Sequence, residues 1–296
     1  MHLGIDIGGT KTDAVVVDAD GTLRGRRTLP SGRGADAVVA AALDAAWGAS
    51  AAAGAAPSDL TVGIGTPGAI CDGVVSHALN LDVERLDLAG GFAAAFGVRP
   101  AVDNDVNVAA LGAYTLLGGT GSMGYLNLGT GLAAGLVLDG RLWRGARGAA
   151  GEIGQICIDP NGPVGTDGLP GGLETYASGS GLMLQWGVEG STGADVVAAA
   201  AAGDPRAVEI RDRAFYGLAT AVRILVVTLD VDEVVVAGGM TKWGDELFDG
   251  ASRILEGWAA TSPFLRSLNL SSRMRPLNLE VPVAAIGAAM LGGGRG

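Results

Sequence analysis

The sequence has few of the residues that mark several common classes of protein. It contains only two cysteines, Cys71 and Cys157, and therefore offers no disulfide framework. Positive charge is scarce, with 20 lysines and arginines against 31 aspartates and glutamates, and the net charge of −11 argues against a nucleic-acid partner. No apolar run reaches the roughly 20 residues of a membrane span. The first residues lack the regions of a signal peptide, so we expect a cytoplasmic protein with no membrane partner.

Small residues dominate what is present. The chain has 296 residues, enough for two domains of ordinary size, and its hydrophobic content of 48% indicates a packed globular protein. Aromatic residues make up only 5%, and alanine and glycine are abundant. We therefore expect helices that pack closely through small side chains.

The first 25 residues predict a β-hairpin that binds phosphates. Two apolar runs, Leu3–Ile7 and Ala14–Val17, flank a glycine-rich turn. Glycines allow backbone N–H groups to approach an anion, while the threonine adds a hydroxyl and the lysine a positive charge. Asp6, at the last inward position before the turn, is placed to hold a hydrated Mg²⁺. The residues expected to bind the nucleotide here are Gly8, Gly9, Thr10 and Lys11.

The alternative is an ordinary hairpin whose glycines only serve the turn, because short glycine patterns are weak signals. The pattern returns, however, at residues 125–145, where a Gly-Thr-Gly turn again separates two apolar runs. Aligning Asp6 with Asn127 gives an offset of 127 − 6 = 121 residues. Such a repeat predicts two similar halves with a nucleotide in the cleft between them. The second set of expected nucleotide-binding residues is Gly129, Thr130 and Gly131.

The rest of the chain alternates strand and helix patterns, which predicts a two-lobed α/β fold with a cleft. We expect an N-terminal lobe over residues 1–117 and a C-terminal lobe over 118–282. The segment 148–172 is rich in glycine and proline and predicts a loop. The last helix, 283–292, is expected to pack back tightly on the N-terminal lobe, since Gly287 lies within an alanine-rich run. The other expected helices are 35–53, 92–96, 106–117, 195–201, 206–229 and 245–259, and the other expected strands are 24–28, 61–65, 101–102 and 233–237.

Seven short motifs in a fixed order carry a family resemblance. They are Asp-Ile-Gly-Gly-Thr-Lys at 6–11, Gly-Thr-Pro-Gly at 65–68, Asp-Asn-Asp-Val-Asn at 103–107, Gly-Thr-Gly at 129–131, Ala-Gly-Glu-Ile-Gly at 150–154, Leu-Glu at 173–174 and Ala-Gly-Gly at 237–239. The ordered set resembles the ROK family of bacterial sugar kinases and repressors. That resemblance implies the actin-like ATPase (ribonuclease H-like) fold, with the active site in the interdomain cleft.

The resemblance also implies an ATP-dependent sugar kinase that uses Mg²⁺ and forms a homodimer. Its expected reaction is phosphorylation of a hexose, at the 6-hydroxyl of glucose or a close analogue. Asp105 matches the family's catalytic base, and phosphoryl transfer needs such a carboxylate beside the attacking hydroxyl. The alternative is that Asp105 only caps a helix beginning at Val106.

Further site residues follow from the same resemblance. Asn104, Glu152 and Glu174 match ligands of the sugar hydroxyls, a task that suits amides and carboxylates because each can bond adjacent hydroxyls. Both glutamates could instead be solvated loop residues. Gly238 and Gly239 match the adenosine-binding turn, although a plain strand-to-helix loop would look similar. The full expected sugar site is Gly65, Asn80, Asn104, Asp105, Glu152, Gln155 and Glu174.

One segment departs from the family pattern. Many members bind a structural zinc through a histidine and three cysteines between the two glutamates. In this chain Gln155 replaces the histidine, and Gly165, Asp167 and Gly172 occupy the cysteine positions. Cys157 is out of register and cannot make a tetrahedral site alone, so we expect no zinc. Because the family's histidine also touches the sugar, Gln155 leaves the identity of the sugar open.

Several alternatives stay open at this point. The sugar could be an amino sugar, mannose or a sugar-like cyclitol, and the donor could be ATP or polyphosphate. A repressor of the same family would carry a winged helix before the first phosphate turn, which here begins near residue 6. The chain could also be a sugar-binding regulator without catalytic activity. The presence of Asp6, Lys11 and Asp105 argues against that function. The oligomeric state and any regulatory role are likewise open.

Overall fold

The computed structural model describes residues 1–296, apart from the side chain of Arg295, and divides into two compact units. Unit 1 is made of residues 1–121, 135–150 and 279–296, and unit 2 of residues 122–134 and 151–278. Among the described residues, no helix is both long and apolar enough to cross a membrane.

The division differs from the expected one because residues 135–150 group with unit 1. Within this unit a side chain at Gly135 would overlap Ala110 Cβ and the backbone of Val106, so the segment lies directly on a helix of unit 1. An ion pair between Arg144 and Asp103 also joins it to that unit. Neither contact has a signal in the local sequence.

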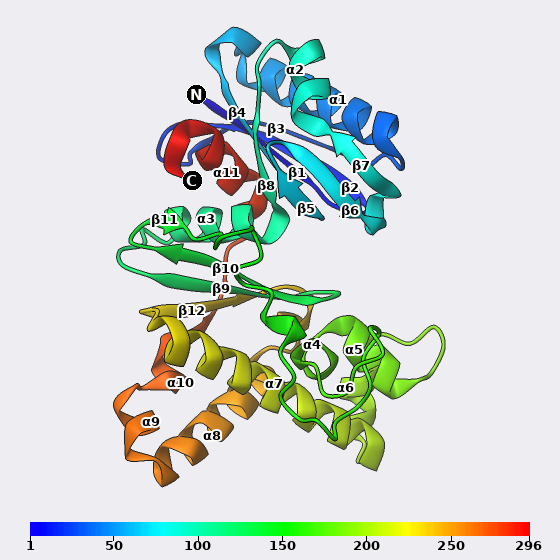
Figure 1. Ribbon diagram of the computed structural model, residues 1–296, viewed down its shortest axis with the longest axis vertical. Coiled ribbons are helices and arrows are strands. Elements are labelled where there is room, and N and C mark those ends of the chain that lie inside the picture. The colour runs from blue at the N-terminus through cyan, green and yellow to red at the C-terminus, as the bar shows by residue number, and fades with distance from the viewer. The chain divides into compact units, whose positions relative to one another are not determined.

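Unit 1 contains a five-stranded sheet of order β3-β2-β1-β4-β8 and a smaller sheet of order β5-β6-β7 (Figure 1). Its strands are β1 (His2–Ile7), β2 (Lys11–Val17), β3 (Leu23–Pro30), β4 (Thr61–Thr66), β5 (Ala69–Cys71), β6 (Val74–Ala78), β7 (Val83–Asp87) and β8 (Ala101–Asn104). Its helices are α1 (Ala35–Ala53), α2 (Leu88–Phe96), α3 (Asp105–Leu116) and α11 (Val283–Met290), with short turns of helix at Pro57–Asp59, Leu79–Leu81 and Leu291–Arg295.

The two faces of the large sheet carry different helices because side chains alternate along a strand. Leu3, Ile5 and Ile7 of β1 are fully buried in the same core cluster as the apolar face of α1. Gly4, between them, faces α11, where a Cβ would overlap the backbone of Ala285. Asp6 has the same parity as Gly4 and therefore leaves the sheet on the α11 face.

The terminal helix packs as tightly as its composition predicts. A Cβ on Gly287 of α11 would overlap the carbonyl of Val108 in α3, and one on Gly112 of α3 would overlap the carbonyl of Val283. Gly63 of β4 meets the backbone of α11 in the same way. Glycine is thus required on both sides of this contact, and the expected close packing of Gly287 is confirmed.

Unit 2 contains most of a second sheet, of order β11-β10-β9-β12-β13. The strands of this sheet are β9 (Met123–Leu128), β10 (Leu132–Leu138), β11 (Arg141–Leu142), β12 (Glu233–Ala237) and β13 (Met274–Pro276). The helices of unit 2 are α4 (Leu173–Tyr176), α5 (Gly179–Trp186), α6 (Gly193–Ala201), α7 (Pro205–Leu229), α8 (Asp245–Thr261), α9 (Pro263–Ser267) and α10 (Leu270–Arg273), with short turns of helix at Ile153–Gln155 and Gly239–Trp243.

The two large sheets share one strand order. In each, the first strand of the hairpin (β1 or β9) pairs in parallel with a later strand (β4 or β12), which in turn pairs in parallel with the last strand, β8 or β13. The repeat seen at an offset of 121 residues is therefore a repeat of sheet topology as well as of the hairpin.

Three sequence expectations need correction. The strand expected at 101–102 continues to Asn104, because it pairs in parallel with β4 as far as Thr66. The helix expected from Val106 begins one residue earlier, at Asp105. The small sheet β5-β6-β7 was not anticipated, since its strands are only three to five residues long and end in turns with positive φ.

Candidate active site

The first phosphate turn is a tight hairpin held from outside by the end of β3. Within the turn, the N–H of Gly8 donates to the carbonyl of Lys11 at 2.9 Å. Ser31 donates its hydroxyl to the carbonyl of Gly8 at 2.6 Å and its N–H to the carbonyl of Thr10 at 3.0 Å. A further bond of 2.9 Å joins the hydroxyls of Ser31 and Thr12. Two carbonyls of the turn are thus engaged, which restricts how the turn can move.

Asp6 lies where three parallel strands end side by side. It is aligned with Gly65 of β4, which is aligned with Asp103 of β8, and across the hairpin it faces Asp13. Burial raises the pKa of Asp6 to about 7, with further contributions from the negative charges of Asp105 and Asp13 and an opposing one from Lys11. A carboxylate offers the oxygen ligands that Mg²⁺ prefers.

The turn between β8 and α3 presents Asn104 and Asp105. Asn104 is the N-cap of α3, and its side-chain oxygen accepts from the N–H of Val106 at 2.9 Å. Asp105 is the first residue of the helix, so the alternative that it serves as the cap is wrong. Burial raises the pKa of the Asp105 carboxyl, while hydrogen bonds from Val106, its own N–H and Asn104 oppose the shift. A carboxyl with a raised pKa binds a proton more readily, as a general base requires.

The carboxylate of Asp103 helps to hold this turn in place. It is only 5% exposed and accepts three hydrogen bonds. The donors to Oδ1 are the backbone N–H of Asn104 at 2.7 Å and Nδ2 of Asn107 at 2.8 Å. The donor to Oδ2 is Nε of Arg144 at 2.6 Å. The position of the Asn104–Asp105 turn therefore depends on a buried carboxylate and on an arginine 41 residues further along the chain.

Gly65 and Asn80 complete the expected residues of unit 1. Gly65 is buried in β4, and a Cβ there would overlap the side chain of Val108 in α3, so packing alone requires this glycine. Asn80 is exposed in the helical turn Leu79–Leu81. A Cβ on Gly9 would lie 3.4 Å from Asn80 Cβ, so Asn80 lies beside the first phosphate turn.

The second phosphate turn lies in unit 2, between β9 and β10. The N–H of Gly129 donates to the carbonyl of Gly131 at 3.0 Å and closes the turn. Gly238, after β12, has a φ of 99°, and a Cβ there would overlap the carbonyl of Leu128 at the end of β9. A Cβ on Gly239 would meet nothing within 4 Å. Of the two glycines, only Gly238 is required by the packing of the chain.

Three expected sugar ligands come together in unit 2. Glu152 and Gln155 are exposed at the two ends of one short turn of helix, and the N–H of Gln155 donates to the carbonyl of Glu152 at 3.3 Å. A Cβ on Gly154, between them, would lie 3.2 Å from the Cβ of Glu174. Oε2 of Glu174 accepts from the N–H of Leu132, directly after the second phosphate turn, at 2.8 Å.

Comparison with known proteins decides the family. The sequence model of the ROK family matches residues 2–291. The chain belongs to the ROK family. It is 30% identical to a glucokinase from Halalkalibacterium halodurans over 87% of this chain and 86% of that protein. It is 32% identical to an N-acetylmannosamine kinase from Escherichia coli O139:H28 over 88% and 89%. The crystal structure of the ROK hexokinase from Thermus thermophilus superposes with a TM-score of 0.82 at 29% identity, covering 98% of this chain and 96% of that one.

The fold is accordingly the two-domain, actin-like ATPase fold of ROK proteins. The segment that departs from the family's zinc pattern contains hydrogen bonds of its own. The carbonyl of Gly171 accepts from Ile158 at 2.8 Å, and the hydroxyl of Tyr176 donates to Asp159 at 3.1 Å. Burial, followed by this bond, raises the pKa of Tyr176 to about 12. The structure describes no group of three or more histidine, cysteine or acidic side chains placed to hold a metal ion, and the absence of zinc stays a prediction.

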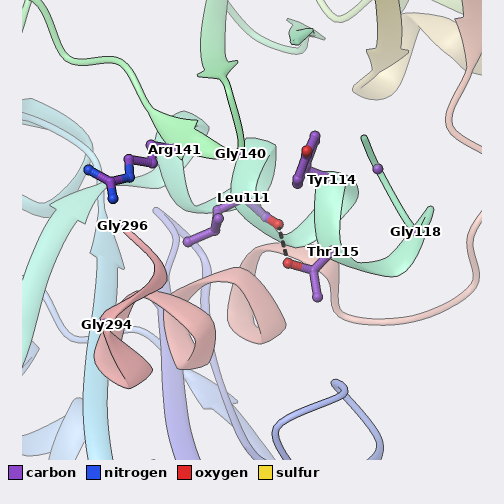
Figure 2. Close-up of a pocket in the computed structure, with 9 residues that line it drawn as sticks. Leu111, Tyr114, Thr115, Gly118, Gly140, Arg141, Gly294 and Gly296 are labelled. Carbon is purple, nitrogen blue, oxygen red and sulfur yellow. Dashed lines mark hydrogen bonds between the residues drawn. The ribbon is translucent and has the colours of Figure 1, made fainter. Parts of the chain in front are cut away.

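A cavity of about 680 Å³ lies elsewhere in unit 1, along the C-terminal half of α3 (Figure 2). Leu111, Tyr114 and Thr115 of α3 line it together with Arg141, and the hydroxyl of Thr115 bonds the carbonyl of Leu111 at 2.9 Å. None of the expected sugar- or nucleotide-binding residues lines this cavity. It is not the candidate active site.

Sequence reasoning missed three residues that support the site: Ser31, Arg144 and Ser180. Ser31 and Arg144 engage the first phosphate turn and Asp103. Ser180 donates its hydroxyl to the carbonyl of Thr130 in the second phosphate turn at 2.8 Å. Each acts from 23 to 50 residues away in sequence, and no local pattern could have pointed to it.

Proposed function

We propose that this chain, a sugar kinase of the ROK family, transfers the γ-phosphoryl group of ATP to the 6-hydroxyl of glucose or a close analogue. One observation supports this most: Asp6 at the end of β1 is in register with Gly65 of β4 and, through it, with Asp103 of β8, and the buried carboxyl of Asp105 follows directly at the first residue of α3. A proton acceptor and a magnesium-binding carboxylate at the same end of neighbouring parallel strands are what phosphoryl transfer to an alcohol requires.

In the proposed reaction, Asp105 accepts the proton of the sugar hydroxyl as its oxygen attacks the γ-phosphorus. The bond from that phosphorus to the β–γ bridging oxygen breaks, and ADP leaves with the electron pair. Asn104, Glu152 and Glu174 hold the sugar hydroxyls, while the turns at Gly8 and Gly129 bind phosphates through backbone N–H groups. Asp6 would hold magnesium through water, and the ion would neutralise charge on the phosphates.

Gln155 favours a second class of substrate as the alternative. This residue stands where many family members have a histidine that touches the sugar, and the relatives of this chain include both glucokinases and an N-acetylmannosamine kinase. An amide offers one acceptor and two donors in place of an imidazole. An amino sugar, mannose or a cyclitol is therefore the alternative acceptor. The homodimer, the cytoplasmic location and the choice of ATP over polyphosphate also remain predictions.

The test is an ADP-release assay with Mg²⁺-ATP across glucose, mannose, glucosamine, N-acetylmannosamine and a cyclitol, with polyphosphate as a second donor. Asp105→Asn keeps the shape of the side chain but removes proton acceptance, so kcat should fall by roughly 10²–10⁴-fold while the sugar still binds. If wild-type protein releases no ADP with any acceptor but binds one of these sugars, the result favours a non-catalytic sugar-binding regulator over the proposed kinase. If Asp105→Asn keeps wild-type turnover, Asp105 is not the base.

A further inference from the structure

The second phosphate turn is bound to a single short segment of unit 2, Glu174–Ser180. The carbonyl of Gly129 accepts from the N–H of Gly179 at 2.9 Å. The carbonyl of Thr130 accepts from the N–H of Ser180 at 3.0 Å and from its hydroxyl at 2.8 Å. The N–H of Leu132 donates to Glu174 at 2.8 Å. The segment therefore holds the carbonyls of Gly129 and Thr130. Because C=O and N–H point in opposite directions across a trans peptide, the N–H groups of Thr130 and Gly131 point away from the segment, which favours their binding a phosphate.

The segment itself is stiff. Ser178 is fully buried, and its hydroxyl accepts from the N–H of Gly181 at 3.0 Å, which fixes the start of α5. Nε2 of Gln185 in α5 donates back to the carbonyl of Thr175 in α4 at 2.7 Å. The Gln185 bond thus joins the two helices, and a Cβ on Gly181 of α5 would overlap the carbonyl oxygens of Thr175 and Glu174 in α4. We therefore expect a displacement of Glu174 to reach Ser180.

The turn and the segment are also in close contact through two glycines. A Cβ on Gly131 would lie 2.6 Å from Oε2 of Glu174, and one on Gly179 would lie 3.2 Å from the carbonyl oxygen of Gly129. Both glycines therefore mark places where the turn and the segment touch directly. A carboxylate expected to hold sugar hydroxyls and a turn expected to hold phosphates share one rigid element.

We propose that Ser180 is a positioning residue for the nucleotide phosphates and that the segment Glu174–Ser180 makes nucleotide affinity depend on whether a sugar is bound at Glu174. This rests on the proposed function for the sugar role of Glu174. A sugar hydroxyl bound to the other carboxylate oxygen, Oε1, restricts the motion of the Glu174 side chain and, through Leu132, of the turn, so less conformational entropy is lost when the nucleotide then binds. By linkage, nucleotide raises sugar affinity by the same factor.

The experiment measures the Kd of the non-hydrolysable analogue AMPPNP with Mg²⁺ by calorimetry, with and without saturating glucose or whichever sugar the ADP-release panel identifies. Wild-type protein should bind AMPPNP about 5- to 150-fold more tightly with sugar present. Ser180→Ala should weaken AMPPNP binding about 2- to 12-fold without sugar, through the loss of one hydrogen bond, and should also lose part of the sugar effect. Ser180→Thr keeps the hydroxyl and should restore both.

Ser272→Ala is the matched control. Its hydroxyl also donates to a backbone carbonyl, that of Asn269, at 2.9 Å, but it lies in α10 and not at the turn. This variant should bind AMPPNP with the wild-type Kd both with and without sugar. Thermal unfolding of every variant excludes a general loss of structure.

The outcomes separate the inference from the proposed function. Ser180→Ala with the affinity and sugar dependence of the control overturns the inference even if the protein is a glucokinase. If the protein phosphorylates no sugar, the proposed function is overturned. The Kd of AMPPNP measured without sugar still decides the role of Ser180. Wild-type protein that does not bind AMPPNP overturns the role of the turn and of Ser180 together.

Discussion

Replacing Arg144 by glutamine should slow catalysis without touching any residue expected to contact substrate. Nε of Arg144 donates to Oδ2 of Asp103 at 2.6 Å, while Oδ1 of Asp103 holds the N–H of Asn104 and the amide of Asn107. Without Arg144, Oδ1 of Asp103 keeps its two hydrogen-bond partners but Oδ2 loses its own. The carboxylate is then less firmly oriented. The turn that carries Asp105 then loses part of its support.

The size of the effect follows from the burial of the pair. A hydrogen bond to a charged group contributes about 1.5–3 kcal/mol. The Asp103 side chain is 7% exposed but that of Arg144 is 37% exposed, so water and salt reduce the contribution, and we expect a loss of ~1–2 kcal/mol in the free energy of unfolding. Since a displacement of about 1 Å can cost on the order of 10²-fold in rate, kcat should fall about 10- to 100-fold.

The assay is steady-state ADP release at saturating ATP, alongside urea unfolding. Arg144→Gln should lower kcat with a much smaller change in KM for the sugar, because Glu152 and Glu174, two of the expected hydroxyl ligands, lie on other segments. Arg141→Gln, at an exposed arginine of β11, is the control and should change neither. A kcat equal to that of the control, or a loss confined to KM, would refute the argument that Asp103 positions Asp105.

Three more variants test other parts of the structure. The pKa of Asp6 is raised from 3.8 to about 7, so its contribution to stability is fully present below about pH 4 and is lost as the pH rises to about 7. Asp6→Asn should therefore stabilise the nucleotide-free protein by at most ~4 kcal/mol at pH 8, at about 1.36 kcal/mol per pKa unit, and by less than half of that at pH 5, and equal melting shifts at both pH values would contradict this. Gly287→Ala should destabilise by about 1–3 kcal/mol in urea unfolding because its Cβ meets the backbone of Val108, whereas Gly257→Ala, with nothing within 4 Å, should be neutral or stabilising; a neutral Gly287→Ala would refute the close contact. Gln155→Ala should lower kcat/KM for the preferred sugar by an amount on the order of 1–3 kcal/mol, and equal losses on analogues that lack the contacted hydroxyl would mean that Gln155 only supports its loop.

Local chemistry alone was enough to predict several elements of this protein. The glycine turn between apolar runs predicted the hairpin β1–β2, and the alanine-rich stretch predicted α1 with the bounds Ala35–Ala53. Helix 206–229 was expected within one residue of its observed start at Pro205, which follows the N-cap Asp204. The repeat of the hairpin likewise predicted two similar halves, since the same short-range pattern folds the same way twice.

Only the tertiary structure decided what surrounds the site residues. Asp103, rather than any residue expected to bind substrate, is the most heavily bonded group of its turn, and its partner Arg144 comes from a distant segment. The side chains of Ser180 and Glu174 bond backbone groups of the second phosphate turn, the carbonyl of Thr130 and the N–H of Leu132. Every residue possesses such backbone groups, so these contacts leave no mark in the sequence. Periodicity and turn residues report interactions over a few positions along the chain. Contacts between segments 20 to 50 residues apart depend on how sheets and helices pack, and so they emerge only when the chain is folded.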